Sequence, residues 1–235
     1  MIEDTRLNEW FVPKFGPLRF RVFIGLLFLP YTGMCISFAV IGSMLSYNIF
    51  WDRVIAIVII YGLALGISAH AADSLGSKTK PWGYYLGKKQ LWLLMVSSIV
   101  AAYSFGFYYI LLYVPFLSIV AIAEGFFVFV YNFELFKGYF HNNFWFAISW
   151  GVLPVIAGFL IQSNSFGVVP FSISIITGLV SYLEIRISRS YKELKRRHSA
   201  PSNYCTKRLE NQLKIISLTT IVFAAALVIS RLIFV

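Results

Sequence analysis

Five long apolar runs without any Asp, Glu, Lys or Arg limit most strongly what this chain can fold into. They cover residues 22–51, 54–72, 90–123, 138–183 and 215–230. A bilayer core is crossed by about 20 helical residues, and backbone groups in lipid must be bonded within the helix. The longer runs have room for two helices each. We therefore expect an all-α, polytopic membrane helix bundle.

The runs predict about seven transmembrane helices in a single domain over residues 22–235. Residues 1–21 carry both charge signs and are predicted to be an interfacial N-terminal segment. Very short links near Tyr108 and at 163–165 predict two tight antiparallel hairpins, and 188–212 has the composition of a flexible, solvated linker. The predicted helices are 22–46, 54–75, 90–107, 109–133, 143–162, 167–187 and 213–234.

The formal net charge of +10 would suit a nucleic-acid partner, but the basic residues lie in the links between apolar runs. With a cytoplasmic N-terminus, all 20 Lys and Arg residues except Arg53 and Arg231 fall on the inner side. This is the asymmetry of the positive-inside rule. It predicts a cytoplasmic N-terminus, an outer C-terminus and a membrane-lipid environment, without nucleic acid as a partner.

The segment SAHAADSLGSKTKPWG, residues 68–83, places charged groups at the predicted inner end of the second helix. His70 and Asp73 are one turn apart and share a helix face. A carboxylate here can hold Mg²⁺, and Lys78 and Lys80 can meet phosphate as point charges. The alternative is a charged helix end whose lysines extend to lipid headgroups.

Glu124 lies inside the fourth predicted helix, in AIAEGFF. An ionised side chain at this depth costs about 3 kcal/mol or more. Glu124 is therefore expected to be neutral, paired or in a wet cavity, either as a functional acid or as a protonated glutamate bonded to a neighbouring helix. His70 is one conceivable partner.

The sixth predicted helix ends in SYLEIRISRS, which contains Glu184, Arg186 and Arg189. These residues lie at the same membrane level as Asp73, so we expect the two carboxylates to approach each other across a cavity that faces the cytoplasm. An amphipathic helix end is the alternative. His141, before the fifth helix, is an interfacial hydrogen-bonding residue or, less simply, part of the site.

Together these residues resemble the UbiA superfamily of intramembrane prenyltransferases, over roughly residues 20–230. In that family the second helix ends in an acidic motif, commonly N-x-x-x-D-x-x-x-D, followed by a basic residue and Pro, and the sixth helix ends in D-x-x-x-D. Asp73 matches the central acid, and Lys80 with Pro81 looks like the basic-Pro pair. Glu184 stands at the first acid of the second motif.

The resemblance implies an enzyme that moves an isoprenoid from a prenyl diphosphate to a lipophilic acceptor. It implies Mg²⁺ at Asp73 and Glu184, diphosphate at Lys78, Lys80, Arg186 and Arg189, and His70, His141 or Glu124 near the chemistry. Ala69, Ser77 and Ser188 replace other polar positions of the family motifs, and the family usually has nine helices. Fewer carboxylates imply weaker Mg²⁺ binding.

Two other functions remain open from the sequence. The first is a non-catalytic UbiA-like protein that binds lipid or serves as a subunit of a membrane complex, which the missing acids favour. The second is a small transporter with Glu124 as its proton or ion site.

Overall fold

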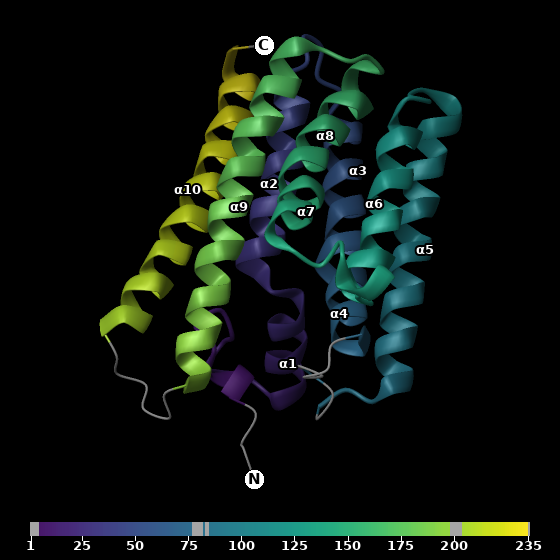
Figure 1. Cartoon of the computed structure of the whole chain (residues 1–235). Helices are drawn as coiled ribbons and strands as arrows, with labels where there is room; N and C mark the ends of the chain where they lie inside the picture. Colours follow the sequence, from purple (N-terminus) through teal and green to yellow (C-terminus); the bar gives the residue numbers. More distant parts are fainter. Residues whose placement is uncertain (1–4, 77–81, 83–84, 198–203, 235) are drawn as a thin grey trace.

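The computed structural model describes residues 5–76, 82, 85–197 and 204–234, and every regular element in this part of the chain is helical. Long helices stand side by side in one bundle (Figure 1). The elements are η1 (Thr5–Asn8), α1 (Leu18–Leu27), α2 (Leu29–Met44), α3 (Trp51–Tyr61), η2 (Gly62–Ala69), α4 (His70–Gly76), α5 (Lys88–Leu112), α6 (Leu117–Asn132), η3 (Phe136–Gly138), α7 (Asn143–Ala147), η4 (Ile148–Val152), α8 (Leu153–Ser163), α9 (Val168–Arg197) and α10 (Tyr204–Phe234).

In the described part of the chain, five helices are long and apolar enough to cross a membrane. A sixth candidate is the pair α1 and α2, which meet at a bend of 42°. Helix α6, Leu117–Asn132, is apolar but shorter. The expectation of an all-helical bundle is confirmed for the described residues, and several helices are long and apolar enough to cross a membrane. Seven crossings and their orientation stay predictions.

The boundaries differ from the expected ones in two places. The link between the third and fourth long helices lies at 113–116, around Pro115, and not near Tyr108, because α5 continues to Leu112. The prediction of a flexible linker over 188–212 is wrong for the described residues on both of its sides. Helix α9 continues to Arg197 and α10 already begins at Tyr204.

Two helices contain π-helical segments where their backbones pass the centre of the bundle. Segment η2 joins α3 to α4, and η4 joins α7 to α8. A π turn holds more residues than an α turn, and such segments occur often at functional sites. Segment η2 ends directly before His70, which the sequence singles out, and η4 contains Trp150.

The centre of the bundle is closely packed because two glycines let α2 and α8 meet backbone to backbone. A Cβ atom at Gly42 would lie 2.0 Å from the carbonyl oxygen of Val155, and one at Gly158 would lie 1.8 Å from that of Ala39. No larger residue fits at either position. The tight contact holds α2 and α8 together, and α7 begins about halfway along the bundle (Figure 1).

Candidate functional site

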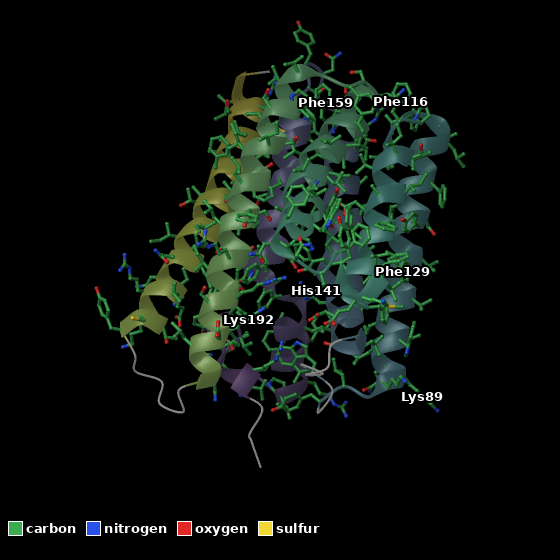
Figure 2. All side chains as sticks on the ribbon, viewed as in Figure 1. Lys89, Phe116, Phe129, His141, Phe159 and Lys192 are labelled. Carbon is green, nitrogen blue, oxygen red and sulfur yellow. The ribbon has the colours of Figure 1, made fainter. Side chains whose placement is uncertain are left out.

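A cavity of about 540 Å³ opens at the end of the bundle where α1 begins and α9 ends. We call it the inner cavity. Figure 2 labels two of its residues, His141 and Lys192, in the lower half of the bundle. Its polar lining consists of Arg6, Tyr31, His70, Asp73, Ser74, Tyr131, Asn132, His141, Ser188, Arg189, Lys192 and Glu193.

Four of the sequence-predicted residues therefore meet in one place. His70 and Asp73 come from α4, His141 from the link before α7, and Arg189 from α9. Segment η2 ends immediately before His70, so the π segment determines the direction in which α4 presents both side chains.

Aromatic rings form a continuous wall along the cavity. The Phe28 ring stacks on Tyr31 with a centroid distance of 4.1 Å and contacts the edge of His70 at 5.5 Å. The wall continues through Trp150, Phe146, Tyr131 and His141, with neighbouring centroids 4.5 to 5.9 Å apart. Such a wall suits an apolar or cationic group, because ring faces carry partial negative charge.

Phe28 reaches this position through a strained backbone. It lies at the bend between α1 and α2 with φ 48° and ψ 50°, in the left-handed region that bulky residues rarely adopt. Strained residues persist where the surrounding contacts hold them, and they gather at binding sites. The bend aims the Phe28 ring at the cavity.

Lys192 is a site residue that the sequence interpretation missed. Its Nζ atom lies 5.2 Å from the centroid of the Phe28 ring, and it lies within electrostatic reach of the carboxyl groups of both Asp73 and Glu184. The signal was available, since Lys192 follows Glu184 and Ser188 at helical spacing. The assumption that α9 ends at 187 concealed it.

The two histidines are fixed by hydrogen bonds on one ring nitrogen each. Thr32 donates its hydroxyl proton to the carbonyl oxygen of Leu27 at 2.6 Å, so its contact of 3.4 Å with Nε2 of His70 assigns the proton of His70 to Nε2. Nδ1 of His70 is then the unprotonated ring nitrogen, which can accept a proton. In the same way Nδ1 of His141 donates to the carbonyl oxygen of Tyr131 at 2.9 Å.

Glu184 lies behind the cavity wall and not in it. The residue is 1% exposed, and its neighbours Ile185 and Ser188 line the cavity. Within the described part of the chain, neither carboxyl oxygen of Glu184 has a hydrogen-bond partner, and the same holds for the hydroxyl of Ser181 one turn earlier. The prediction that Asp73 and Glu184 approach each other across a cavity is therefore wrong, because only Asp73 lines it. Lys192 lies within electrostatic reach of both carboxyl groups.

Glu124 occupies a different place. It lies in an apolar chamber of about 60 Å³ between α3, α5, α6 and α8, which we call the Glu124 chamber. The hydroxyl groups of Tyr61 and Ser149 donate to its two carboxyl oxygens at 3.0 Å each. The suggested partner His70 is not one of these donors, because His70 points toward the inner cavity.

Arg186, in contrast, does not line the inner cavity. Arg186 is exposed on another face of α9. Lys78 and Lys80 lie outside the described residues. In the described ranges no three His, Cys, Asp or Glu side chains are close enough to hold a metal ion together. Asp73 alone suits a Mg²⁺ that takes its other ligands from phosphate and water, whereas Glu184 is sealed off.

Comparison of the chain with models of known protein families, with curated proteins and with solved structures gave no match. The resemblance to the UbiA superfamily thus rests on the motifs around Asp73 and Glu184 and on the helical layout. It enters below as a proposal.

Proposed function

We propose that this chain is a UbiA-like membrane prenyltransferase, which binds a prenyl diphosphate in the inner cavity and moves the isoprenoid to a lipophilic acceptor. One observation carries the proposal. Asp73, Arg189 and Lys192 converge with an aromatic wall on a single cavity at the end of an apolar bundle. Few ligands besides a phosphorylated lipid need both surfaces.

The cations bind the diphosphate of the ligand, and the aromatic rings contact its prenyl chain. The Arg189 guanidinium bonds phosphate oxygens as a fork, and Lys192 contributes a point charge. Arg189 is already oriented, since it donates to the hydroxyl of Tyr131 at 3.3 Å. Asp73 would hold Mg²⁺ carried on the diphosphate, and the ion would neutralise the leaving charge. The prenyl chain lies along the aromatic wall.

In the proposed transfer the bond between C1 of the prenyl group and the diphosphate oxygen breaks, and its electron pair leaves with the diphosphate. The faces of Phe28 and Tyr31 stabilise the allylic cation. A nucleophilic atom of the acceptor forms the new bond to C1 and loses a proton. Nδ1 of His70 is the base that the hydrogen-bond pattern favours.

A second candidate is a lipid-binding protein without transferase activity. The sealed position of Glu184 favours it, because Glu184 is then not available as the second Mg²⁺ ligand that the resemblance implies. The same cavity and cations would then bind the diphosphate without turning it over. No observation of the Glu124 chamber supports a transporter in the same way.

The deciding experiment incubates the purified protein with radiolabelled farnesyl diphosphate and a membrane lipid extract, with Mg²⁺ or with EDTA. We expect a new labelled lipid with Mg²⁺ only. Arg189→Gln should lower its yield about tenfold, whereas Arg186→Gln, a matched change on the exposed face of the same helix, should leave it unaltered. Binding without product supports the second candidate, and the absence of both overturns the two proposals.

A further inference from the structure

Residues 5–16, which we call the N-terminal roof, fold back on themselves instead of extending along the membrane surface. Arg21 donates from Nε to the carbonyl oxygen of Pro13 at 2.8 Å and from Nη2 to that of Leu7 at 3.2 Å. Lys14 donates to the carbonyl oxygens of Leu7 and Glu9. The roof is thus a compact unit tied to α1.

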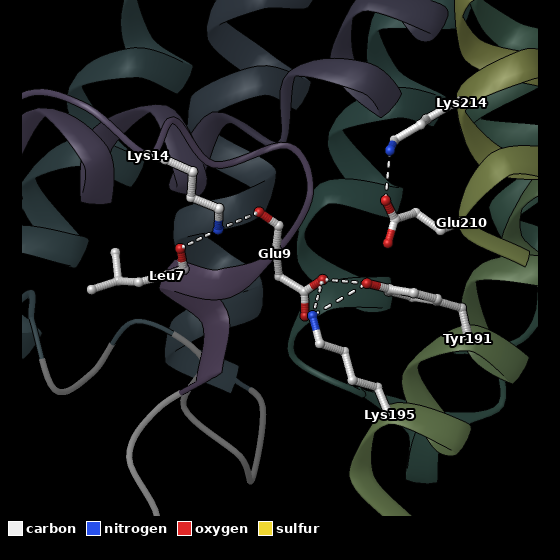
Figure 3. A network of polar contacts seen from close by, with 7 residues as sticks. All are labelled: Leu7, Glu9, Lys14, Tyr191, Lys195, Glu210 and Lys214. Atoms are coloured by element: carbon white, nitrogen blue, oxygen red, sulfur yellow. Dashed lines mark hydrogen bonds and ion pairs between the residues drawn. The ribbon is translucent and has the colours of Figure 1, made fainter. Parts of the chain in front are cut away.

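The roof is also fastened to the end of α9. Glu9 accepts a hydrogen bond from the Tyr191 hydroxyl at 3.0 Å and forms an ion pair with Lys195 at 3.0 Å (Figure 3). Lys195 also donates to the Tyr191 hydroxyl at 3.2 Å. These three residues form what we call the Glu9 clasp. It joins the beginning of the chain to a helix more than 180 residues later.

Apolar contacts close the roof against the cavity wall. Val12 is 2% exposed and packs with Val22, Leu26 and Trp82 in one buried cluster. The ring of Phe11 meets the edge of Phe28 at 4.2 Å. Since Phe28 also stacks on Tyr31, the roof is continuous with the aromatic wall.

The roof brings Arg6 to the inner cavity. Arg6 is among the lining residues and lies within electrostatic reach of His70, Asp73 and Lys192. Arg6 and Lys192 line the same cavity, so an anion bound there is attracted by both cations. Arg6 therefore adds a third cation, after Arg189 and Lys192, to the lining of the cavity.

We propose that the N-terminal roof is part of the binding site: the Glu9 clasp holds Arg6 over the inner cavity, where its guanidinium binds the phosphate end of an anionic lipid. That the anion is a prenyl diphosphate rests on the proposed function. The clasp is a partly exposed ion pair, which stabilises weakly.

The test measures binding of farnesyl diphosphate and of inorganic pyrophosphate to the full-length protein. Arg6→Gln should weaken both about tenfold, since a hydrogen bond to a charged group contributes on this scale. Arg19→Gln, at an exposed position on α1, is the matched control and should bind like the wild type.

The clasp is tested separately by charge reversal. Glu9→Lys and Lys195→Glu should each weaken binding and speed up proteolytic cleavage within residues 5–16, and the double variant should recover much of both. Cleavage that is as slow in the single variants as in the wild type would overturn the clasp.

The outcomes separate this proposal from the proposed function. If farnesyl diphosphate binds but Arg6→Gln binds it equally well, the roof proposal fails and the function stands. If only inorganic pyrophosphate binds and Arg6→Gln weakens it, the roof proposal stands and the function fails. Binding of neither probe by the wild type overturns both.

Discussion

The Glu124 chamber and the region of Glu184 show two ways of placing an acid inside apolar helices. Glu124 has a hydroxyl donor from each of two other helices and almost purely apolar surroundings. Glu184 has no hydrogen-bond partner among the described residues, but it lies next to a large polar cavity with Lys192 within electrostatic reach. The first arrangement ties helices together, and the second keeps an acid beside a site.

The difference teaches that an acid within a membrane helix does not indicate its role by itself. Both glutamates break the same sequence rule, because both interrupt an apolar run. What distinguishes them is whether neighbouring helices satisfy the carboxyl oxygens. A satisfied acid in a dry chamber is explained by packing, whereas an unsatisfied one beside a cavity is not.

The largest expected effect separates the two regions by activity. Asp73→Asn, in the inner cavity, should lower prenyl transfer by about 100-fold or more, because a charge that stabilises the reacting groups is lost at unchanged shape. Glu124→Gln should change the rate less than threefold. The measurement is the initial rate of transfer from farnesyl diphosphate. A large loss of rate in Glu124→Gln but not in Asp73→Asn would place the chemistry in the Glu124 chamber instead of the inner cavity.

The second prediction compares the two glutamates by stability. Glu124→Leu leaves the hydroxyls of Tyr61 and Ser149 without their acceptor and should destabilise the fold by about 2 kcal/mol. Glu184→Leu removes an unpartnered buried carboxyl and should stabilise it by about 1 kcal/mol. Denaturant unfolding in detergent gives both values. Effects of the same sign would show that Glu184 has a partner after all.

The third prediction concerns Lys192, a cation in the lining of the inner cavity. Lys192→Gln should weaken farnesyl diphosphate binding about tenfold, and the salt dependence of the remaining binding should become shallower. Lys89→Gln, exposed at the start of α5, is the control. Unchanged affinity in Lys192→Gln would remove this residue from the site.

The smallest effects are expected within the Glu124 chamber. Tyr61→Phe and Ser149→Ala should each cost about 1 kcal/mol of unfolding free energy, since each removes one hydrogen bond and leaves a carboxyl oxygen less satisfied. Each should lose its effect in the Glu124→Leu background, where no acceptor is present. Additive effects in a double-mutant cycle would contradict a direct bond.

The helices could be predicted because apolar runs of this length have one solution in lipid. Asp73, His70 and Arg189 could also be placed near each other, since they close helices at the same level. Lys192 was missed although its helical spacing from Glu184 and Ser188 pointed to it, because the polar composition of residues 188–212 is typical of a solvated linker. The donors of Glu124 were equally hidden, as hydroxyl residues are common in membrane helices.

The backbone strain at Phe28 and the roof over the cavity depend on contacts between distant parts of the chain. Glu9 meets Lys195, and Phe11 meets Phe28, only after α1, α2 and α9 have packed. Such pairs cannot be predicted from the residues next to them in the sequence. The N-terminal segment was expected to be interfacial, and its contacts place Trp10 beside Lys214 and Phe11 against Phe28.

In a regular α-helix, the number of residues sets both the length of the helix and the direction in which its last side chains point. A π segment changes that direction with little change in length. Each residue of an α-helix turns the chain by about 100°. Loss of one residue from η2 would leave a span long enough for the bilayer but would rotate His70 and Asp73 away from their neighbours. The extra residue of the π turn therefore sets the direction in which His70 and Asp73 point. It does so independently of the length of the helix.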